Sequence, residues 1–314
     1  MTVLEAIQKS ADFLAKKGVE SARLNAELLL AHLLKLPRMK LYLNFDRVLT
    51  APETDGLREL IKRRATREPL QHITGSTSFC GCEISVSRHA LVPRPETELL
   101  AEIGWKFLQG RADLPVSQDA EQRAPTTALD FGTGTGCIAI ALAAKAAKTK
   151  ITALDISPDA LALARQNAKL NKVAERIDFL LSDGFAALEG RWGERPREPK
   201  PDSQNGSPEV PPHQFDLIIS NPPYIASAEI ETLDPEVKDF DPRGALDGGL
   251  DGLDFYLRLA KEAGSFLKPA GKIMVEFGDG QADAIHHIFM AQKWIVEAVK
   301  ADYSQRARIL IGRI

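Results

Sequence analysis

A glycine-rich segment contains the first residues whose spacing suits ligand binding. It reads FGTGTG from residue 131 to residue 136, between an apolar run that ends at Asp130 and a helical pattern that begins near Cys137. Backbone N–H groups in such a turn, together with the positive end of the helix, face one ligand, and glycines let that ligand approach closely. A dinucleotide fingerprint would need its third glycine at position 137. The sequence therefore disfavours NAD, while a purely structural turn stays open at this point.

Two carboxylates end the next two strand patterns. Asp155 ends the second apolar run and can accept hydrogen bonds from both hydroxyls of an adenosine ribose. Asp183 ends the third and could face the exocyclic amine of an adenine. Either carboxylate alone could be a solvated strand end. Because the carboxyl ends of parallel strands meet at one edge of a sheet, the two together predict a nucleoside site.

The motif SNPPY, residues 220–224, directly follows the apolar run FDLIIS. Pro222 and Pro223 fix φ and keep Asn221 out of helical geometry, so the Asn221 side chain is held at the sheet edge. A tight turn would account for the prolines alone. It would not account for the aromatic Tyr224 at the strand end that meets the glycine loop.

The apolar pattern predicts the elements that position these residues. From residue 126 onward, strand-like runs alternate with helical patterns, as in a parallel sheet covered on both faces. The runs end at Asp130, Asp155, Asp183, Ser220 and Phe277. The helix after the second run is well signalled, because Ser157 can cap it and Pro158 fits its first position. Residues 294–299 and 307–312 are expected to pair as an antiparallel hairpin at one sheet edge. The prediction is a doubly wound α/β domain.

The chain before this domain predicts two smaller parts. Residues 1–70 carry apolar positions at helical spacing in three stretches, the second of which Ser21 could cap, and so predict a helical unit. Residues 71–92 change to short alternating stretches separated by glycines, which predicts a bridging β-hairpin. Residues 93–314 then form the α/β domain. Within it, the polar segment 109–125 and the proline-rich segment 191–214 are expected to be mobile surface loops.

Composition narrows the class of protein. The 314 residues include 40 Lys and Arg against 43 Asp and Glu, for a net charge of −3, with 44% hydrophobic residues. These values are typical of a globular chain and argue against bulk binding of nucleic acid. Three cysteines favour a reducing, cytoplasmic compartment. No apolar run approaches the ~20 residues of a membrane span, and no His or Cys spacing indicates a metal site.

Longer motifs carry a family resemblance over nearly the whole chain. The glycine loop, the acidic strand ends and NPPY resemble class I S-adenosylmethionine methyltransferases, whose fold is a Rossmann-like, mostly parallel seven-stranded sheet. Five segments narrow this to the HemK/PrmC family of peptide chain release factor glutamine methyltransferases. They are PLQHITGSTSFCG (69–81), LVPRPETE (91–98), SNPPYI (220–225), DPRGALDGGLDGLDFY (241–256) and KIMVEFGDGQ (272–281).

The resemblance implies methylation of the side-chain amide N5 of the glutamine in the Gly-Gly-Gln loop of class I release factors, a step tied to translation termination. It implies S-adenosylmethionine as cofactor, held by Gly132, Thr133, Gly134, Thr135, Gly136, Asp155, Asp183, Gly184 and Asn221. It implies a substrate clamp formed by Asn221, Pro222, Pro223 and Tyr224, with Arg94 and Glu96 at the mouth of the site. Gly184 stands where the family often has an aromatic residue, so a backbone contact is expected there.

A mechanism follows from the chemistry of the amide. Its nitrogen is a poor nucleophile, so the enzyme must orient the lone pair toward the sulfonium methyl and stabilise the developing cation. Our hypothesis assigns the catalytic roles to three residues. The Asn221 side-chain oxygen and the Pro222 carbonyl accept the two amide N–H groups, while Tyr224 packs on the amide plane.

Other functions stay open on the sequence alone. The same chemistry could act on a glutamine of a ribosomal protein. The NPPY clamp would also suit N6-adenine methylation of DNA or RNA, which the net charge and the lack of a Lys/Arg-rich insert disfavour. A cofactor-binding adaptor without activity is disfavoured by the intact Asn221 and Tyr224. The expected partner is therefore a class I release factor, bound by a monomer through its helical unit, with no membrane or direct nucleic-acid partner.

Overall fold

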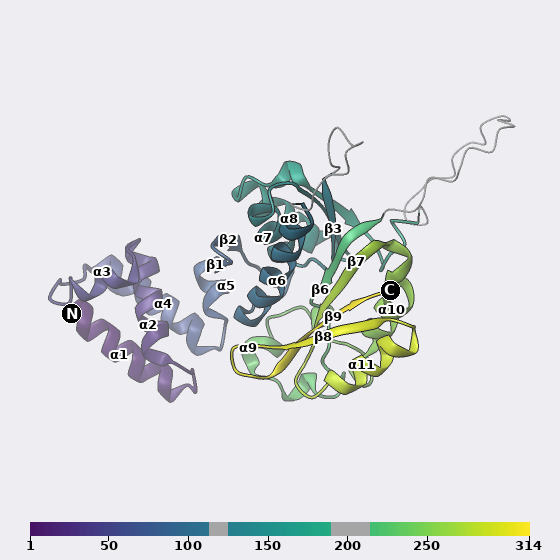
Figure 1. Cartoon of the computed structure of the whole chain (residues 1–314). Coiled ribbons are helices and arrows are strands. Elements are labelled where there is room, and N and C mark those ends of the chain that lie inside the picture. The colour runs from purple at the N-terminus through teal and green to yellow at the C-terminus, as the bar shows by residue number, and fades with distance from the viewer. Residues whose placement is uncertain (113–124, 190–213) are drawn as a thin grey trace, which may run out of the picture. The chain divides into compact units, whose positions relative to one another are not determined.

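The computed structural model describes residues 1–112, 125–189 and 214–314 (Figure 1). The chain forms two compact units. The helical unit comprises Met1–Thr77, Val86–Arg88 and Glu231–Asp241, and the sheet unit comprises Ser78–Ser85, His89–Ile230 and Pro242–Ile314. Most of the two segments predicted as mobile loops lies outside the described residues. No helix within the three described stretches is long and apolar enough to cross a membrane.

The helical unit is built on short helices, two of which begin at capping boxes. The helices are α1 (Val3–Lys16), α2 (Ala22–Leu34), α3 (Arg38–Tyr42), α4 (Ala51–Ala65), α5 (Leu70–Thr74) and α9 (Pro235–Lys238), and the 3-10 turn η2 (Ile230–Thr232) begins at its boundary. Thr2 with Glu5, and Thr50 with Glu53, form capping boxes that start α1 and α4. Apolar faces of α1, α2 and α4 enclose one core, which includes Ile7, Leu29 and Leu57.

The predicted cap at Ser21 is wrong. Ser21 adopts left-handed φ of 48° and makes no side-chain hydrogen bond to α2. A capping side chain needs extended backbone to reach the first N–H groups of its helix. Here the turn between α1 and α2 is instead held by Asn25, whose Nδ2 donates to the carbonyls of Glu20 and Ser21.

A two-stranded hairpin of β1 (Ser76–Phe79) and β2 (Cys82–Ser85) lies within the range 71–92, whose first residues belong instead to the helix α5. Its two-residue turn has positive φ at both Cys80 and Gly81, the geometry that fits the twist of paired strands. Within the sheet unit, the fully buried side chain of Asn167 holds β2 through bonds to the backbone N–H and carbonyl of Ser85.

Seven strands form one sheet in the described part of the sheet unit. They are β3 (Thr126–Phe131), β4 (Thr149–Asp155), β5 (Ile177–Leu181), β6 (Phe215–Ser220), β7 (Leu267–Glu276), β8 (Ile295–Ala301) and β9 (Ala307–Arg313). Their order is β5-β4-β3-β6-β7-β9-β8, and all neighbours are parallel except those of β9 (Figure 1). This confirms the predicted fold class and the predicted terminal hairpin. The third strand stops at Leu181, so Asp183 lies two residues beyond the strand that it was predicted to end.

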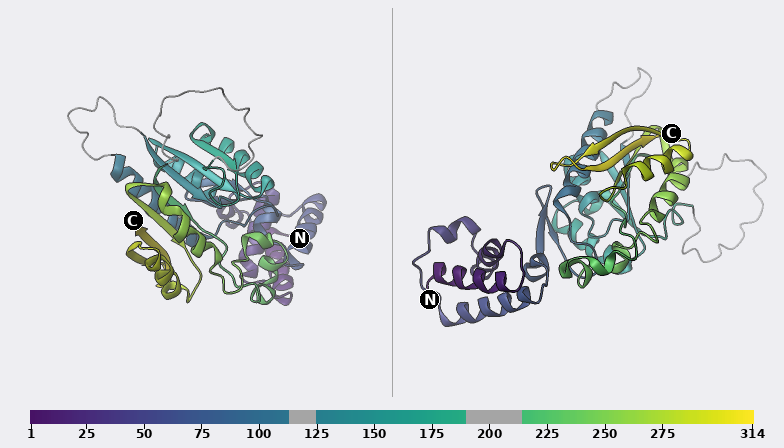
Figure 2. Two further views of the ribbon diagram at one scale, coloured as in Figure 1. Left: turned by 90° about the vertical axis from the view of Figure 1, so that its right-hand side faces the viewer. Right: turned by 90° about the horizontal axis from the view of Figure 1, so that it is seen from below.

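Helices cover both faces of the sheet (Figure 2). On one face lie α6 (Pro95–Ala112), α7 (Cys137–Lys145) and α8 (Pro158–Leu170), and on the other lie α10 (Asp254–Glu262) and α11 (Ala282–Ala291); the 3-10 turns are η1 (Ala174–Arg176), η3 (Arg243–Ala245) and η4 (Ala263–Phe266). The β6 side chains alternate: Leu217 and Ile219 approach Gly104 of α6, while Ile218 joins the core beneath α10 and α11. Ser157 caps α8, as predicted, by accepting from the Ala160 N–H at 3.2 Å.

The prediction of a loop from residue 109 is wrong at its start, because α6 continues to Ala112. Two polar side chains in this last turn have fixed partners. Gln109 donates to the Lys145 carbonyl, and Arg111 forms an ion pair with the buried carboxylate of Asp216 at 2.9 Å. These contacts hold the polar turn on the sheet unit as a helix.

Candidate functional site

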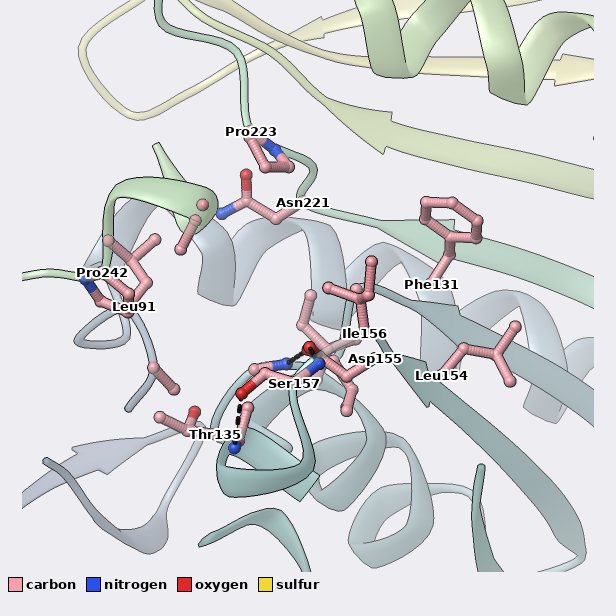
Figure 3. Close-up of a pocket in the computed structure, with 18 of the residues that line it drawn as sticks. Leu91, Phe131, Thr135, Leu154, Asp155, Ile156, Ser157, Asn221, Pro223 and Pro242 are labelled. Carbon is pink, nitrogen blue, oxygen red and sulfur yellow. Dashed lines mark hydrogen bonds between the residues drawn. The ribbon is translucent and has the colours of Figure 1, made fainter. Parts of the chain in front are cut away.

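A cavity of about 310 Å³ opens at the carboxyl ends of β3, β4 and β6, within the sheet unit. Asn221 and Pro223 lie on one side of it, and Asp155, Ser157 and Thr135 lie on the opposite side (Figure 3). Ten predicted site residues line it: Arg94, Gly132, Thr133, Gly134, Thr135, Asp155, Asp183, Gly184, Asn221 and Pro223. Four others, Glu96, Gly136, Pro222 and Tyr224, are outside the lining, and the ligand-binding roles expected of them stay predictions.

The glycine loop owes its shape to left-handed backbone. Gly132, Gly134 and Gly136 have φ of 72°, 55° and 80°, which other residues adopt only with strain. Gly132 faces open space, whereas a Cβ on Gly136 would lie 3.0 Å from the Cβ of Ala164 in α8. The first two glycines therefore leave room above the loop, and the third allows α7 to pack closely against α8.

Asp130 holds the loop from below and is fully buried. Its Oδ2 accepts hydrogen bonds from the Thr133 hydroxyl at 2.6 Å and from the Ala139 N–H at 3.2 Å. Burial raises the pKa of this carboxyl to about 7, and the two hydrogen bonds only partly offset that effect. The role of Asp130 is thus to fix the turn between β3 and α7.

Asp155 lies at the end of β4 with both carboxylate oxygens engaged by backbone. Oδ2 accepts from the Gly134 N–H at 2.8 Å, and Oδ1 accepts from the Ser157 N–H at 2.9 Å. Each oxygen keeps a second lone pair, which suits the two hydroxyls of a ribose. Burial raises the pKa of Asp155, opposed by these backbone bonds. Apolar side chains of Phe131, Leu154 and Ile156 line the cavity nearby, so the residues present fit a nucleoside.

Asp183 and Gly184 both contact a residue that sequence reasoning missed. Arg258 of α10 lines the same cavity and forms an ion pair with the Asp183 carboxylate through Nη1. Its Nη2 also donates to the Asp183 carbonyl at 3.0 Å. A Cβ on Gly184 would lie 2.2 Å from the guanidinium carbon, so the absence of a side chain there makes room for Arg258. No pattern around residue 258 signals this role.

Asn221 follows β6 directly and is fixed by a second missed residue. Its Nδ2 donates to the hydroxyl oxygen of Thr97 in α6 at 3.0 Å. Thr97 is buried, and it lies inside the LVPRPETE segment, of which only Arg94 and Glu96 were singled out. With its nitrogen held by Thr97, Asn221 keeps its side-chain oxygen for a hydrogen-bond donor in the cavity.

Tyr224 packs as a half-buried residue against the core cluster beneath α10 and α11. Its carbonyl accepts a hydrogen bond from Gln281 Nε2 at 2.9 Å, which ties the segment after the prolines to the loop before α11. Burial raises the pKa of the Tyr224 phenol. The phenol therefore stays protonated at neutral pH and offers an aromatic face rather than a base.

Comparisons with known proteins agree with this architecture. The PrmC N-terminal domain family matches residues 5–75, and a methyltransferase domain family matches residues 123–308. A release factor glutamine methyltransferase of Geobacter sulfurreducens is 38% identical over 315 residues, covering 100% of this chain and 97% of that protein. One of Koribacter versatilis is 36% identical and covers 100% and 99%.

Among solved structures, the ribosomal protein L11 methylase of Lactobacillus delbrueckii subsp. bulgaricus aligns with 69% of this chain and 78% of its own, at 20% identity and a TM-score of 0.43. The full-length relatives carry the assignment. Their identity and coverage, together with the matched methyltransferase domain, support the fold and the cofactor independently of the sequence motifs. The chain belongs to the release factor glutamine methyltransferase family, whose members are class I S-adenosylmethionine-dependent enzymes.

Proposed function

We propose that this chain transfers a methyl group from S-adenosylmethionine to the side-chain amide N5 of the glutamine in the Gly-Gly-Gln loop of class I release factors. One observation carries the proposal. Asn221 lines the cavity with its side-chain nitrogen bound to Thr97, which leaves its amide oxygen as a fixed acceptor. The family to which the chain belongs indicates that the donor to this oxygen is the side-chain amide of a glutamine.

The cofactor would be held by residues of the sheet unit. The loop around Gly132 and Gly134 would lie against it, Asp155 would accept its ribose hydroxyls, and the Asp183–Gly184 segment would border its adenine. The bound cofactor supplies an electrophilic methyl group on a sulfonium. That methyl group would pass to the glutamine nitrogen with the cofactor sulfur as leaving group and its electron pair staying on sulfur, and the proton that the nitrogen loses would go to solvent water.

Orientation of the substrate amide is the main task of the protein. The Asn221 Oδ1 and the Pro222 carbonyl would accept the two amide N–H groups, which turns the nitrogen lone pair toward the methyl group. Tyr224 would pack on the amide plane. Acceptors also stabilise the positive charge that the nitrogen gains, so no strong base is needed before transfer.

The helical unit is the part proposed to recognise the protein substrate. A single loop glutamine offers far less surface than a specific protein interface buries. The proposal therefore assigns recognition of the release factor to residues 1–70, and it takes the enzyme to act as a monomer in the cytoplasm. All three cysteines are free thiols, in keeping with a reducing compartment.

The experiment is transfer of a labelled methyl group from S-adenosylmethionine to purified release factor. A copy of the factor with its Gly-Gly-Gln glutamine replaced, a ribosomal protein preparation and adenine-containing DNA are the other acceptors. We expect label on the intact factor only. Label on a ribosomal protein would support glutamine methylation but show that the release factor is not the substrate. Label on DNA, or on no acceptor, would overturn the proposal.

A further inference from the structure

A buried carboxylate lies behind the Asn221–Thr97 pair. Glu276 ends β7, the strand beside β6, and the register that pairs Ser220 with Val275 brings Asn221 level with Glu276. The Glu276 side chain is 3% exposed and accepts a hydrogen bond from the Thr97 side chain. Its Oε2 is buried with no hydrogen-bond partner in the described structure. Burying such a group is costly, which calls for a reason beyond packing.

The reason lies in the direction of the hydrogen bonds. An ionised carboxylate only accepts, so the Thr97 hydroxyl must donate its one hydrogen to Glu276. The Thr97 oxygen is then left only with acceptor capacity toward Asn221. That acceptor fixes the Asn221 amide with Nδ2 toward Thr97, at 3.0 Å, and with Oδ1 turned away from it.

We propose that Glu276 and Thr97 are positioning residues that fix the orientation of the Asn221 amide, so that Asn221 offers an acceptor and never a donor to the substrate amide. This inference rests on the proposed function and deepens it. A flipped Asn221 would point N–H groups at the N–H groups of the glutamine. The logic is that of the buried carboxylate in a Ser-His-Asp triad, which fixes the tautomer of its histidine without touching the substrate.

The surroundings of Glu276 favour its ionised form, which accepts from the Thr97 hydroxyl, above neutral pH. Burial raises the pKa of Glu276 to about 7, while Thr97 and Arg308 of β9 oppose that rise and Glu96 of α6 adds to it. The phenols of Tyr224 and Tyr256 also face Glu276, and burial raises the pKa of both, so both stay neutral. A protonated Glu276 could donate to Thr97, which would free the Thr97 hydroxyl to donate to Asn221 and reverse the amide.

Two near-isosteric variants test the direction of the bonds. Glu276→Gln gives the carboxylate position a donor, and Thr97→Val removes the hydroxyl. We expect kcat for the release factor to fall about tenfold to a hundredfold in each, the range for loss of a preorganised contact, with cofactor Kd within about twofold by titration calorimetry. Thr97→Ser keeps the hydroxyl and should recover most of kcat. Wild-type kcat in both Glu276→Gln and Thr97→Val would overturn the inference.

Matched controls use buried groups at the far end of the same sheet. Thr126→Val removes a buried hydroxyl bonded to Thr149, and Asp216→Asn neutralises a buried carboxylate at the start of β6. Both should lower the melting temperature and leave kcat unchanged. A loss of kcat in these controls equal to that in Thr97→Val would show that general destabilisation is the cause, and would contradict a positioning role.

A pH profile adds a readout that packing alone would not change. With saturating cofactor, wild-type kcat should fall as pH drops through about 7, and Glu276→Gln should lack this acid limb. Asp130 also has a pKa raised to about 7 and is retained in that variant. If kcat of both proteins fell at acid pH with the same midpoint, the fall would be assigned to Asp130. That result would count against the inference.

The side-chain amide resonances of Asn221 separate this inference from the proposed function. In labelled protein without substrate, Thr97→Val and Glu276→Gln should shift the Asn221 Nδ2 hydrogens, whereas Thr126→Val should not. If the wild-type protein transfers no methyl group to the factor, the proposed function fails. The resonances would still show whether Glu276 and Thr97 fix the orientation of the Asn221 amide. Unshifted Asn221 resonances in both variants would overturn the inference.

Discussion

The backbone N–H of Gly134 donates to Oδ2 of Asp155 at 2.8 Å, so the carboxylate suited to a ribose also holds the glycine loop. The two parts of the cofactor site lie on different strands and are linked directly by this bond. Ser157 at the start of α8 donates to the other carboxylate oxygen. A change at Asp155 therefore acts on the ribose contact and on the loop at once.

Asp155→Asn should weaken S-adenosylmethionine binding by about tenfold to a hundredfold, because a hydrogen bond to a charged group contributes roughly 1.5–3 kcal/mol. The amide also turns an N–H toward one of the two backbone donors. Titration calorimetry measures the Kd, and Asp178→Asn, an exposed carboxylate on β5, is the control. Burial raises the pKa of Asp155, so wild-type affinity should fall as pH falls toward that raised pKa. An unchanged Kd in Asp155→Asn would remove the ribose role.

Gly184→Ala should weaken cofactor binding through Arg258. The new Cβ would lie 2.2 Å from the guanidinium carbon, and the φ of 60° at this position adds about 1 kcal/mol of strain. Arg258 can swing outward, but it then loses Asp183. We expect a several-fold rise in cofactor Kd for Gly184→Ala and for Arg258→Ala, and little further rise in the double variant. Fully additive effects would show that the two positions act separately.

Asn221→Ala should lower kcat about a hundredfold, since loss of one preorganised contact costs on the order of 3 kcal/mol. Methyl transfer to intact release factor is the measurement, with cofactor Kd measured in parallel. Asn171→Ala is a matched control, because its side chain is bonded to Glu83 and Asn167, outside the cavity lining. Full methyl transfer in Asn221→Ala with unchanged cofactor binding would refute the acceptor role.

The main sheet was predictable because buried parallel strands give uninterrupted apolar runs, and because carboxylates at their ends stand out. Asp155 was singled out as the end of one such run and Asn221 from the SNPPY motif that follows another, and both line the cavity. Asp183 was singled out too and also lines the cavity, although β5 stops two residues earlier at Leu181. The residue that contacts it, Arg258, lies on an amphipathic helix where nothing local marks an arginine that reaches the cavity.

Contacts between distant segments account for the rest of what sequence reasoning missed. Thr97 and Glu276 are each ordinary residues in their own segments, and only the packing of α6 against the β6–β7 edge brings them to Asn221. The short helices α3, α5 and α9 were missed because four or five residues carry too little periodicity to count. Ser21 is an error of the opposite kind. Its residue type suits a helix cap, but its left-handed backbone keeps the side chain from capping α2.

Substitutions on the helical unit should affect the protein substrate and not the cofactor. Met39 and Leu43 are 71% and 75% exposed on and just after α3. Exposed apolar side chains of this size gain roughly 1.5–3 kcal/mol each when fully buried by a partner. Met39→Ser with Leu43→Ser should raise KM for intact release factor about tenfold or more and leave cofactor Kd unchanged. Met290→Ser, an exposed methionine on α11, is the control. An unchanged KM would place recognition elsewhere.

Glu236 binds the segment after NPPY into the helical unit. It accepts from Arg64 Nη2 at 2.9 Å and Arg67 Nε at 2.6 Å. The Arg64 side chain is 7% exposed, so Glu236→Ala leaves a buried guanidinium N–H without its partner. The expected loss is about 2 kcal/mol of unfolding free energy in urea at pH 7. Glu59→Ala, which breaks an exposed pair with Lys62, should cost under about 0.5 kcal/mol.

The contribution of Glu236 should also depend on pH, with a sign fixed by its partners. Burial alone would raise the pKa of Glu236, but hydrogen bonds from Arg67 and Arg64 outweigh burial and hold it below the ordinary 4.5. The folded state therefore binds this proton less readily than the unfolded state. Its stabilisation is complete above pH 4.5 and is lost as pH falls through the lowered pKa. The stability gap between wild type and Glu236→Ala should shrink in that acid window, and a gap that widened there would reverse the assignment.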